Sequence, residues 1–313
     1  MINLPSVRHL RHLTALYDYG HFGRAAEACH VTQSTLSASI KELESVLQVT
    51  LVDHSKRRAV LTPVGVETVE RARKIVKEVE DLVSFTTASR EPLSSALRMG
   101  TIPTIGPFLL PHVLPGLRET YRGLKLYLVE DMTDRLIASL HRGELDVVLL
   151  ALPHECGAVE NVVLFKDPFV VGLPRGHPLT KEVRIKPQNL LREDLLLLKD
   201  GHCLRDHALA ALRRLADRRI AEFEATSLQT LVQMVDNGLG TTLLPTLAVD
   251  AGLLLGTSLT TRPLLTDEPA RDICLVWRRG TGRREEFRLL AKELTQRAKV
   301  AAKSAAPSPR VAK

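Results

Sequence analysis

Residues 22–47 contain two short helical patterns separated by a turn, and this feature restricts the fold of the amino-terminal segment more than any other. The first pattern carries small side chains that let a second helix approach closely: Ala25, Ala26 and Ala28. The second pattern has one apolar stripe at helical spacing: Leu36, Ile40, Leu43 and Leu47. We therefore expect a helix, a tight turn and a second helix, packed through their apolar sides.

The polar face of the second predicted helix is suited to nucleic acid. Thr32 stands where an N-cap hydroxyl would accept a backbone N–H, so the start of the helix is expected at the surface. Helix N-termini favour phosphate, and amide side chains can pair with adenine. The candidate DNA-binding residues of this hairpin are Arg24, Thr32, Gln33, Ser34, Thr35, Ser37 and Lys41. An ordinary helical hairpin with a solvated polar face is the alternative interpretation.

Residues 51–63 favour DNA binding over that alternative. They predict a two-stranded wing whose basic tip would contact the DNA backbone through Lys56, Arg57 and Arg58. Pro63 is typical of the first turn of a helix, and apolar residues interleaved with charge then continue to about Ser89. Such a helix usually pairs with a second copy of itself, so we expect a homodimer at least.

In these motifs the chain resembles the LysR-type transcriptional regulators, and the resemblance covers nearly its whole length. The matching segments, in order and at the family's spacing, are Ala25-Ala26, Gln33-Ser34-Thr35-Leu36-Ser37, Leu43-Glu44 and Leu61-Thr62-Pro63-Val64-Gly65. His54 departs from the pattern, because the family commonly has an arginine there, and Val49-Thr50 replaces a common glycine.

The resemblance implies an α/β chain in four parts. They are a winged helix-turn-helix DNA-binding domain at 1–62, a dimerising linker helix at 63–91, a two-lobed effector domain like the periplasmic binding proteins at 92–300, and a basic tail at 301–313. It also implies a homotetramer that binds double-stranded promoter DNA and works with RNA polymerase, and that is not an enzyme.

The formal net charge of +7 is not in itself an argument for DNA binding, because of where the charge lies. Residues 278–313 hold 11 of the 43 basic side chains and only three of the 36 acidic ones, so the rest of the chain is nearly neutral. The segment from residue 301 onward is poor in apolar bulk, and we expect a disordered, solvated tail there.

Residues 93–299 alternate short β-like runs with helical patterns. We expect strands at 96–101, 125–129, 147–150 and 169–172, and helices at 108–121 and 133–143. This order predicts parallel sheets of the doubly wound type. A turn-rich segment at 172–179 marks the crossing into a second lobe, and a late strand at 273–277 is expected to return to the first. Ligands of such folds bind between the lobes.

Hydropathy and cysteine spacing suggest a cytoplasmic protein without metal or cofactor. No apolar run approaches the ~18 residues that span a bilayer, so we expect no membrane segment. Cys29, Cys156, Cys203 and Cys274 are far apart and form no CxxC pair, which argues against zinc and against a disulfide framework.

Cys203 stands out among these cysteines because of its neighbours. The apolar run 195–198 ends in a turn at Gly201, after which Cys203 lies beside His202 with Arg205 two residues later. At a helix start, unpaired N–H groups and nearby cations would favour the reactive thiolate. A lone cysteine is, however, more often a small buried apolar residue.

The segment 201–206 resembles the peroxide-sensing site of the OxyR branch of the LysR family, as do 102–107 and 225–231. By that resemblance Cys203 is the cysteine that hydrogen peroxide oxidises to a sulfenic acid, and Thr104 and Thr133 hydrogen-bond the peroxide. The other pocket residues that it suggests are His202, Arg205, Asp206, Thr226 and Ser227.

The resemblance fails at one position. The branch normally has a second cysteine nine residues after the reactive one, and this chain has Leu212 there. Several outcomes stay open: Cys203 stops at the sulfenic acid, joins a small thiol, or pairs with Cys156, Cys274 or another subunit. The chain could also respond to a small molecule between the lobes, without thiol chemistry. A solute-binding protein or an enzyme with a helical extension is the competing class, and the amino-terminal match disfavours it.

Overall fold

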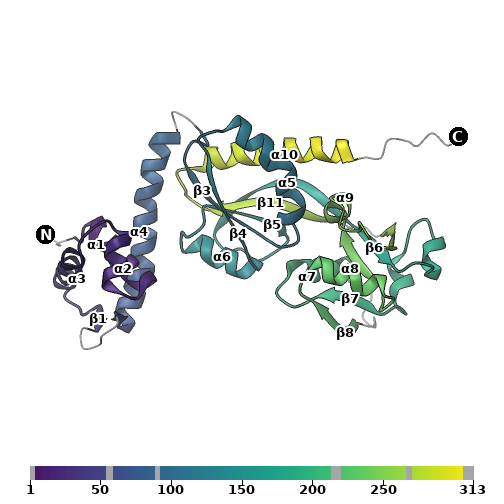
Figure 1. The fold of residues 1–313 in the computed structure, drawn as a ribbon, viewed down its shortest axis with the longest axis horizontal. Coiled ribbons are helices and arrows are strands. Elements are labelled where there is room, and N and C mark those ends of the chain that lie inside the picture. Colours follow the sequence, from purple (N-terminus) through teal and green to yellow (C-terminus); the bar gives the residue numbers. More distant parts are fainter. Residues whose placement is uncertain (1–3, 54–58, 89–91, 213–219, 266–269, 306–313) are drawn as a thin grey trace. The chain divides into compact units, whose positions relative to one another are not determined.

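A computed structural model describes residues 4–53, 59–88, 92–212, 220–265 and 270–305. The chain divides into two compact units: residues 1–90 with 281–283, and the remainder from residue 91 onward. They are called here the DNA-binding unit and the effector unit, and each is described by itself (Figure 1). Among the described residues, no helix is long and apolar enough to cross a membrane.

Three helices, a short hairpin and a long helix make up the DNA-binding unit. They are α1 (Val7–Tyr19), α2 (Phe22–Ala28), α3 (Gln33–Leu47), β1 (Val52–Asp53), β2 (Val60–Leu61) and α4 (Pro63–Ala88). Leu36, Ile40 and Leu43 are fully buried with Ala25 and Ala26, as the apolar stripes predicted. Two members of those stripes are not buried: Leu47 is 36% exposed at the end of α3, and Ala28 is exposed at the end of α2.

The junction between wing and helices explains why the Leu43-Glu44 and 61–65 segments matter for the fold. Glu44 Oε1 accepts hydrogen bonds from the backbone N–H of Leu51 (2.7 Å) and Val52 (3.0 Å), which holds β1 against α3. Thr62 accepts the N–H of Gly65 at 3.0 Å at the start of α4. A Cβ on Gly65 would lie 2.1 Å from the Leu51 carbonyl oxygen, so only glycine fits this close approach.

The helix α4 exposes apolar side chains in the DNA-binding unit. Val69 and Ala72 pack into its core, whereas five apolar side chains are exposed: Val64, Val66, Ile75, Leu82 and Val83. A helix with this much uncovered apolar surface favours association. The predicted tip of the wing, Lys56 to Arg58, lies outside the described residues.

The first lobe of the effector unit is built on one mixed sheet. Its elements are β3 (Ala96–Thr101), α5 (Gly106–Thr120), β4 (Lys125–Glu130), α6 (Thr133–His141), β5 (Val147–Leu152), β11 (Ala270–Arg278) and α10 (Arg284–Ala305). Strands β4, β3 and β5 are parallel, as predicted, while β11 pairs antiparallel with β5. β5 reads Val-Val-Leu-Leu-Ala-Leu and is almost wholly buried, because β3 and β11 flank it on both sides.

The long strand β6 (Val159–Leu173) connects the lobes. Its first part pairs with β11, and its last part pairs with β9 (Thr242–Pro245) and β10 (Thr260–Pro263). The second lobe also contains the parallel strands β7 (Leu195–Leu198) and β8 (Ile220–Ala225). Its helical elements are η1 (Pro178–Lys181), η2 (Pro187–Leu190), α7 (Cys203–Ala211), α8 (Leu228–Asp236) and α9 (Thr246–Asp250). Each lobe has its own apolar core.

Three expectations need correction. The sheets are mixed instead of parallel throughout, because β6 and β11 run antiparallel to their neighbours. The expected strand 169–172 is only the last part of β6. The expected tail begins too early, since α10 continues to Ala305.

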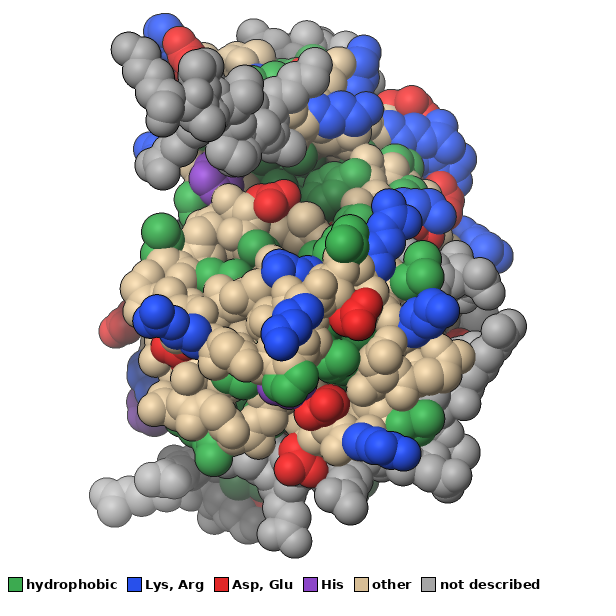
Figure 2. Space-filling view, turned by 90° about the vertical axis from the view of Figure 1, so that its right-hand side faces the viewer, with side chains coloured by type: hydrophobic (Ala, Val, Ile, Leu, Met, Phe, Trp, Pro, Cys, Tyr) green, Lys and Arg blue, Asp and Glu red, His purple; other side chains and the backbone are tan. Residues whose placement is uncertain are grey.

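Over the face seen in Figure 2, basic and acidic side chains are interspersed with apolar ones.

Candidate peroxide site and DNA interface

The local sequence around Cys203 produces a helix start inside the effector unit. β7 is buried along its length, and the chain then turns at Gly201, whose φ of +94° favours glycine. His202 follows as the N-cap residue, and Cys203 is the first residue of α7. The helix start was predicted from the same residues.

Cys203 lies at the contact between the lobes. Its side chain is 4% exposed and packs in the core of the first lobe, whereas Leu204 and Ala208 on the same helix pack in the core of the second. The thiol also hydrogen-bonds with the Thr133 side chain at the start of α6 and with the backbone of Ala151 in β5. The amino-terminal end of α7 therefore connects both lobes through the cysteine.

A small recess surrounds this thiol. It is too small to hold a water molecule in this conformation. The residues that line it are Ile102, Pro103, Thr104, Met132, Thr133, Gly201, His202 and Cys203. Of the predicted pocket residues, the structure thus brings Thr104, Thr133 and His202 together with Cys203. Small shifts of these side chains are needed before a molecule of even the size of water can enter.

Arg271 supplies a fixed positive charge beside the recess. This fully buried side chain donates to Asp167 Oδ2 through Nε (3.1 Å) and Nη2 (3.0 Å). It also donates through Nη1 to Thr104 Oγ1 (2.9 Å) and through Nη2 to the Thr104 carbonyl (3.0 Å). Because the Thr104 oxygen accepts from the guanidinium, its own hydroxyl proton can point to another acceptor in the recess.

His202 offers the recess a further polar atom. The side chain is 4% exposed, and its Nε2 is buried without a hydrogen-bond partner among the described residues. Burial lowers the pKa of this imidazole, so the ring is neutral at pH 7 and one of its nitrogens can donate. A buried nitrogen of this kind costs free energy until a ligand satisfies it.

The thiol of Cys203 is not the low-pKa thiol that its helix start suggested. Burial raises its pKa above the usual value, and the charge on Asp206 acts in the same direction. Arg271 and the hydrogen bonds from Thr133 and Ala151 oppose this rise without reversing it. The expectation of a stabilised thiolate is therefore wrong for this conformation, because desolvation of the charged form outweighs the cation.

Four predicted pocket residues lie elsewhere. Arg205 turns away from the recess and pairs with Asp200 (2.8 Å) and Glu224 (3.3 Å). Asp206 and Thr226 are exposed, and neither lines the recess. Ser227 caps α8 by accepting the N–H of Thr230 at 3.2 Å. Arg205 and Asp206 were chosen because they follow Cys203 in sequence, and Thr226 and Ser227 because they belong to the matching segment 225–231. None of the four lines the recess.

Sequence reasoning missed Arg271 and Asp167, the ion pair that positions Thr104. The one available signal was a charged residue within each apolar strand pattern: Arg271 near the start of 270–277, and Asp167 in the middle of 162–173. Such a signal does not show that two residues 104 positions apart pair with each other.

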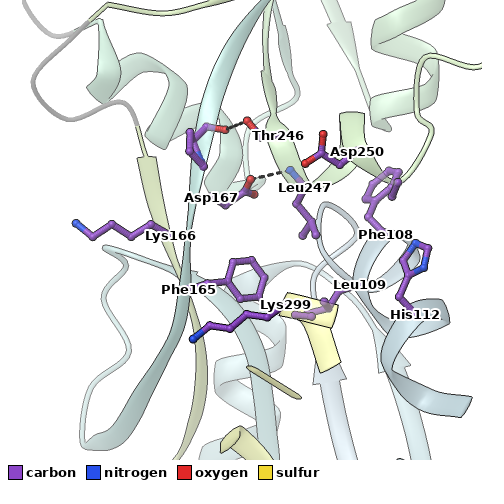
Figure 3. A pocket seen from close by; sticks show the side chains of 13 residues that line it. Phe108, Leu109, His112, Phe165, Lys166, Asp167, Thr246, Leu247, Asp250 and Lys299 are labelled. Atoms are coloured by element: carbon purple, nitrogen blue, oxygen red, sulfur yellow. Dashed lines mark hydrogen bonds between the residues drawn. The ribbon is translucent and has the colours of Figure 1, made fainter. Parts of the chain in front are cut away.

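A second cavity, of about 300 Å³, lies between α5, β6, α9 and α10. Figure 3 shows Phe108 and His112 on one side of it, and Phe165 and Lys299 on the other. Asp167, the partner of Arg271, forms part of its wall and accepts the backbone N–H of Leu247 at 2.8 Å. Asp167 therefore connects the wall of this cavity to Thr104 through its ion pair with Arg271.

The candidate DNA interface lies on the exposed start of α3. Thr32 caps the helix by accepting the N–H of Thr35 at 3.2 Å. The predicted contact residues here are exposed, except for the half-buried Ser37: Arg24, Thr32, Gln33, Ser34, Thr35 and Lys41. The polar face that the sequence predicted for this helix is thus exposed, while its opposite face fills the core.

Comparison with known proteins agrees with both parts of the chain. Residues 7–66 match the family described as bacterial regulatory helix-turn-helix protein, lysR family, and residues 90–299 match the LysR substrate binding domain. This chain belongs to the LysR family of DNA-binding transcriptional regulators.

Within that family, it is similar to proteins named for their response to hydrogen peroxide. It is 39% identical to the DNA-binding transcriptional dual regulator OxyR of Escherichia coli, over 93% of this chain and 95% of that protein. It is 40% identical to a probable hydrogen peroxide-inducible genes activator of Mycobacterium avium, over 92% of each chain.

Among solved structures, a full-length OxyR of Pseudomonas aeruginosa with a cysteine replaced by aspartate has a TM-score of 0.77. It is 35% identical, with 93% of this chain and 95% of that chain covered. An OxyR of Corynebacterium glutamicum, with a cysteine replaced by serine and bound to hydrogen peroxide, has a TM-score of 0.67. It is 31% identical over the full length of both chains.

Proposed function

We propose that this chain is a transcription regulator that senses hydrogen peroxide through oxidation of Cys203. The observation that carries the proposal is the recess itself: a thiol at a helix start, two threonine hydroxyls, a buried guanidinium and an unsatisfied imidazole nitrogen meet there. The relatives named for hydrogen peroxide support the same assignment.

The chemistry follows from these groups. The Cys203 thiolate attacks one peroxide oxygen, the O–O bond breaks, and the leaving hydroxide takes up a proton to give water and a Cys203 sulfenic acid. Donors that are already in place stabilise the charge that develops on the leaving oxygen. Thr104, held by Arg271, and His202 are the donors we assign to this role.

Oxidation of Cys203 can alter the regulator because this residue lies at the contact between the two lobes. The side chain packs in one lobe while its helix packs in the other, so an added oxygen or a new bond disturbs the contact between them. We further propose a homotetramer, assembled through α4 and the effector unit, that binds promoter DNA in the cytoplasm and contacts RNA polymerase. The polar face of α3 and the wing are its DNA contacts, including Lys56, Arg57 and Arg58.

Promoter footprinting before and after peroxide tests this function. We expect purified reduced protein to change its footprint when a few equivalents of peroxide are added, and Cys203→Ser to keep the reduced footprint. Cys29→Ser is the matched control, since this cysteine lies in the DNA-binding unit. An unchanged footprint of the wild-type protein, with Cys203 demonstrably oxidised, contradicts the regulatory part of the proposal.

A second candidate function is a response to a small molecule, because the 300 Å³ cavity offers an apolar site with Lys166, Lys299 and Asp250 at its edge. The two functions are separable. A ligand that changes the footprint of Cys203→Ser as strongly as that of the wild type would favour the small-molecule function.

A further inference from the structure

A second buried thiol, Cys156, lies in the connection between β5 and β6. Cys156 is 7% exposed and packs in the core of the first lobe, which also contains Cys203 and Cys274. All three are free thiols. The peroxide chemistry described above assigns no role to Cys156.

Hydrogen bonds hold the connection that carries Cys156 against the surroundings of Cys203. The carbonyl of Pro153 pairs with His207 Nε2 at 2.8 Å, and His207 lies one helical turn after Cys203. His154 Nε2 pairs with Asp134 at 2.9 Å, next to the Thr133 that hydrogen-bonds the Cys203 thiol. Residues 153–156 therefore run beside the start of α7 and along α6.

The electrostatics agree with this placement. Burial, the Glu155 carboxylate and then a charge on Cys203 raise the pKa of the Cys156 thiol. A negative charge on Cys203 would thus disfavour a thiolate on Cys156, although the two cysteines are 47 residues apart in sequence.

Cys156 is better suited to react with an oxidised Cys203 than Cys274 is. Cys274 is fully buried in the middle of β11, where strands pair on both sides, and its pKa is raised to about 12. Cys156 lies outside the strands, in a connection that can shift without breaking a sheet ladder. Position 212, nine residues after Cys203, holds a buried leucine.

We propose that Cys156 is the resolving thiol of this chain and forms a disulfide with Cys203, a role that rests on the proposed oxidation of Cys203. The Cys156 sulfur attacks the sulfur of the sulfenic acid, the S–O bond breaks, and the hydroxyl leaves with the Cys156 proton as water. Hydrogen peroxide is the only oxidant, and the product is one intrachain disulfide.

The bond would change the contact between the lobes. A disulfide needs Cα atoms within about 7 Å, so Cys156 and Cys203 must lie within that separation in the oxidised protein. Any movement that brings them together strains the hydrogen bonds of His141, His154 and His207, which fix the connection in the reduced protein.

Mass analysis of the full-length protein tests the resolving role. Reduced protein, free of added thiols, is treated with a slight excess of peroxide, blocked with alkylating reagent and digested. We expect the wild type to lose two hydrogen atoms and to give a peptide pair that joins Cys156 to Cys203. Cys156→Ser and Cys156→Ala should stop at a Cys203 sulfenic acid, one oxygen heavier and trapped by a dimedone reagent.

Cys274→Ser is the matched control, and it should still form the disulfide. Melting temperatures of all variants show whether each has folded. Two different replacements are made at position 156, so that the test still stands if one of them does not fold. A wild-type protein that accumulates the sulfenic acid with Cys156 reduced would overturn the proposal, as would a bond from Cys203 to Cys274 or to a second chain. If Cys203 resists peroxide in every variant, the proposed function fails first, and the resolving role falls with it.

Discussion

At the scale of single residues, the site depends on one charge that lies outside its own stretch of sequence. Arg271 hydrogen-bonds Thr104, acts to lower the pKa of the Cys203 thiol and is itself held by Asp167. Burial works against the thiolate, and this cation works for it. The balance between them sets how much of Cys203 is reactive at a given pH.

Oxidation of Cys203 should therefore accelerate as the pH rises. Burial and Asp206 raise the pKa of the thiol, and Arg271 only partly offsets them, so at pH 6–8 the reactive thiolate is the minor form. We expect the rate constant to increase by about tenfold per pH unit over this range, because the thiolate fraction does. Quenched-flow mass analysis measures it, with Cys203→Ser as the background. A rate that is flat from pH 6 to pH 8 would mean that the thiol is already ionised.

Replacing Arg271 should lower the free energy of unfolding of the chain. Arg271→Gln leaves the Asp167 carboxylate buried at the lobe contact without its cation, a change that typically costs about 3–5 kcal/mol. Urea unfolding of the full chain measures the loss. Arg135→Gln is the control, since that side chain is 76% exposed and its pair with Asp131 should contribute under about 1 kcal/mol. Equal effects of the two replacements would contradict the burial argument.

At the scale of elements, the helix-turn-helix was predictable and the recess was not. Leu36, Ile40 and Leu43 repeat at helical spacing within a few residues, so local pattern was enough to place α3 and its exposed face. β3 and the return of β11 to the first lobe were likewise predictable from apolar runs. Thr104 comes from the turn after β3, and Thr133, Cys203 and Arg271 come from α6, α7 and β11, so no local periodicity brings these residues together.

The close approach at the start of α4 gives an element-scale prediction. Gly65→Ala would push a Cβ into the Leu51 carbonyl oxygen, and an overpacked contact of this kind costs typically about 1–3 kcal/mol. Thermal unfolding should show a lower transition for the DNA-binding unit.

Gly23→Ala is the matched control for Gly65→Ala. Its Cβ meets the His21 side chain at 3.1 Å and Gln33 Oε1 at an ordinary 3.6 Å, and it gains helix propensity within α2. Its stability should therefore stay within about 1 kcal/mol of the wild type, and a loss as large as that of Gly65→Ala would refute the steric explanation.

At the scale of the whole molecule, the exposed apolar side chains of α4 lead us to expect association through this helix. Ile75→Glu and Leu82→Glu place charges on positions that are 49% and 63% exposed in the single chain, so folding of the chain should be unaffected. If α4 is covered by a second copy, the paired charges should lower the mass measured by light scattering. Glu80→Gln, exposed on the same helix, is the control and should keep the wild-type mass. An unchanged assembly in both charged variants would place the subunit contact elsewhere.

The rate at which peroxide oxidises Cys203 in the folded chain, compared with the same thiol in the urea-unfolded chain, tests the central claim most directly. Although burial disfavours the thiolate, the preorganised donors of the recess should make the folded reaction at least about a hundredfold faster at the same pH. A folded rate equal to or below the unfolded rate would show that the recess protects a structural cysteine and does not sense peroxide.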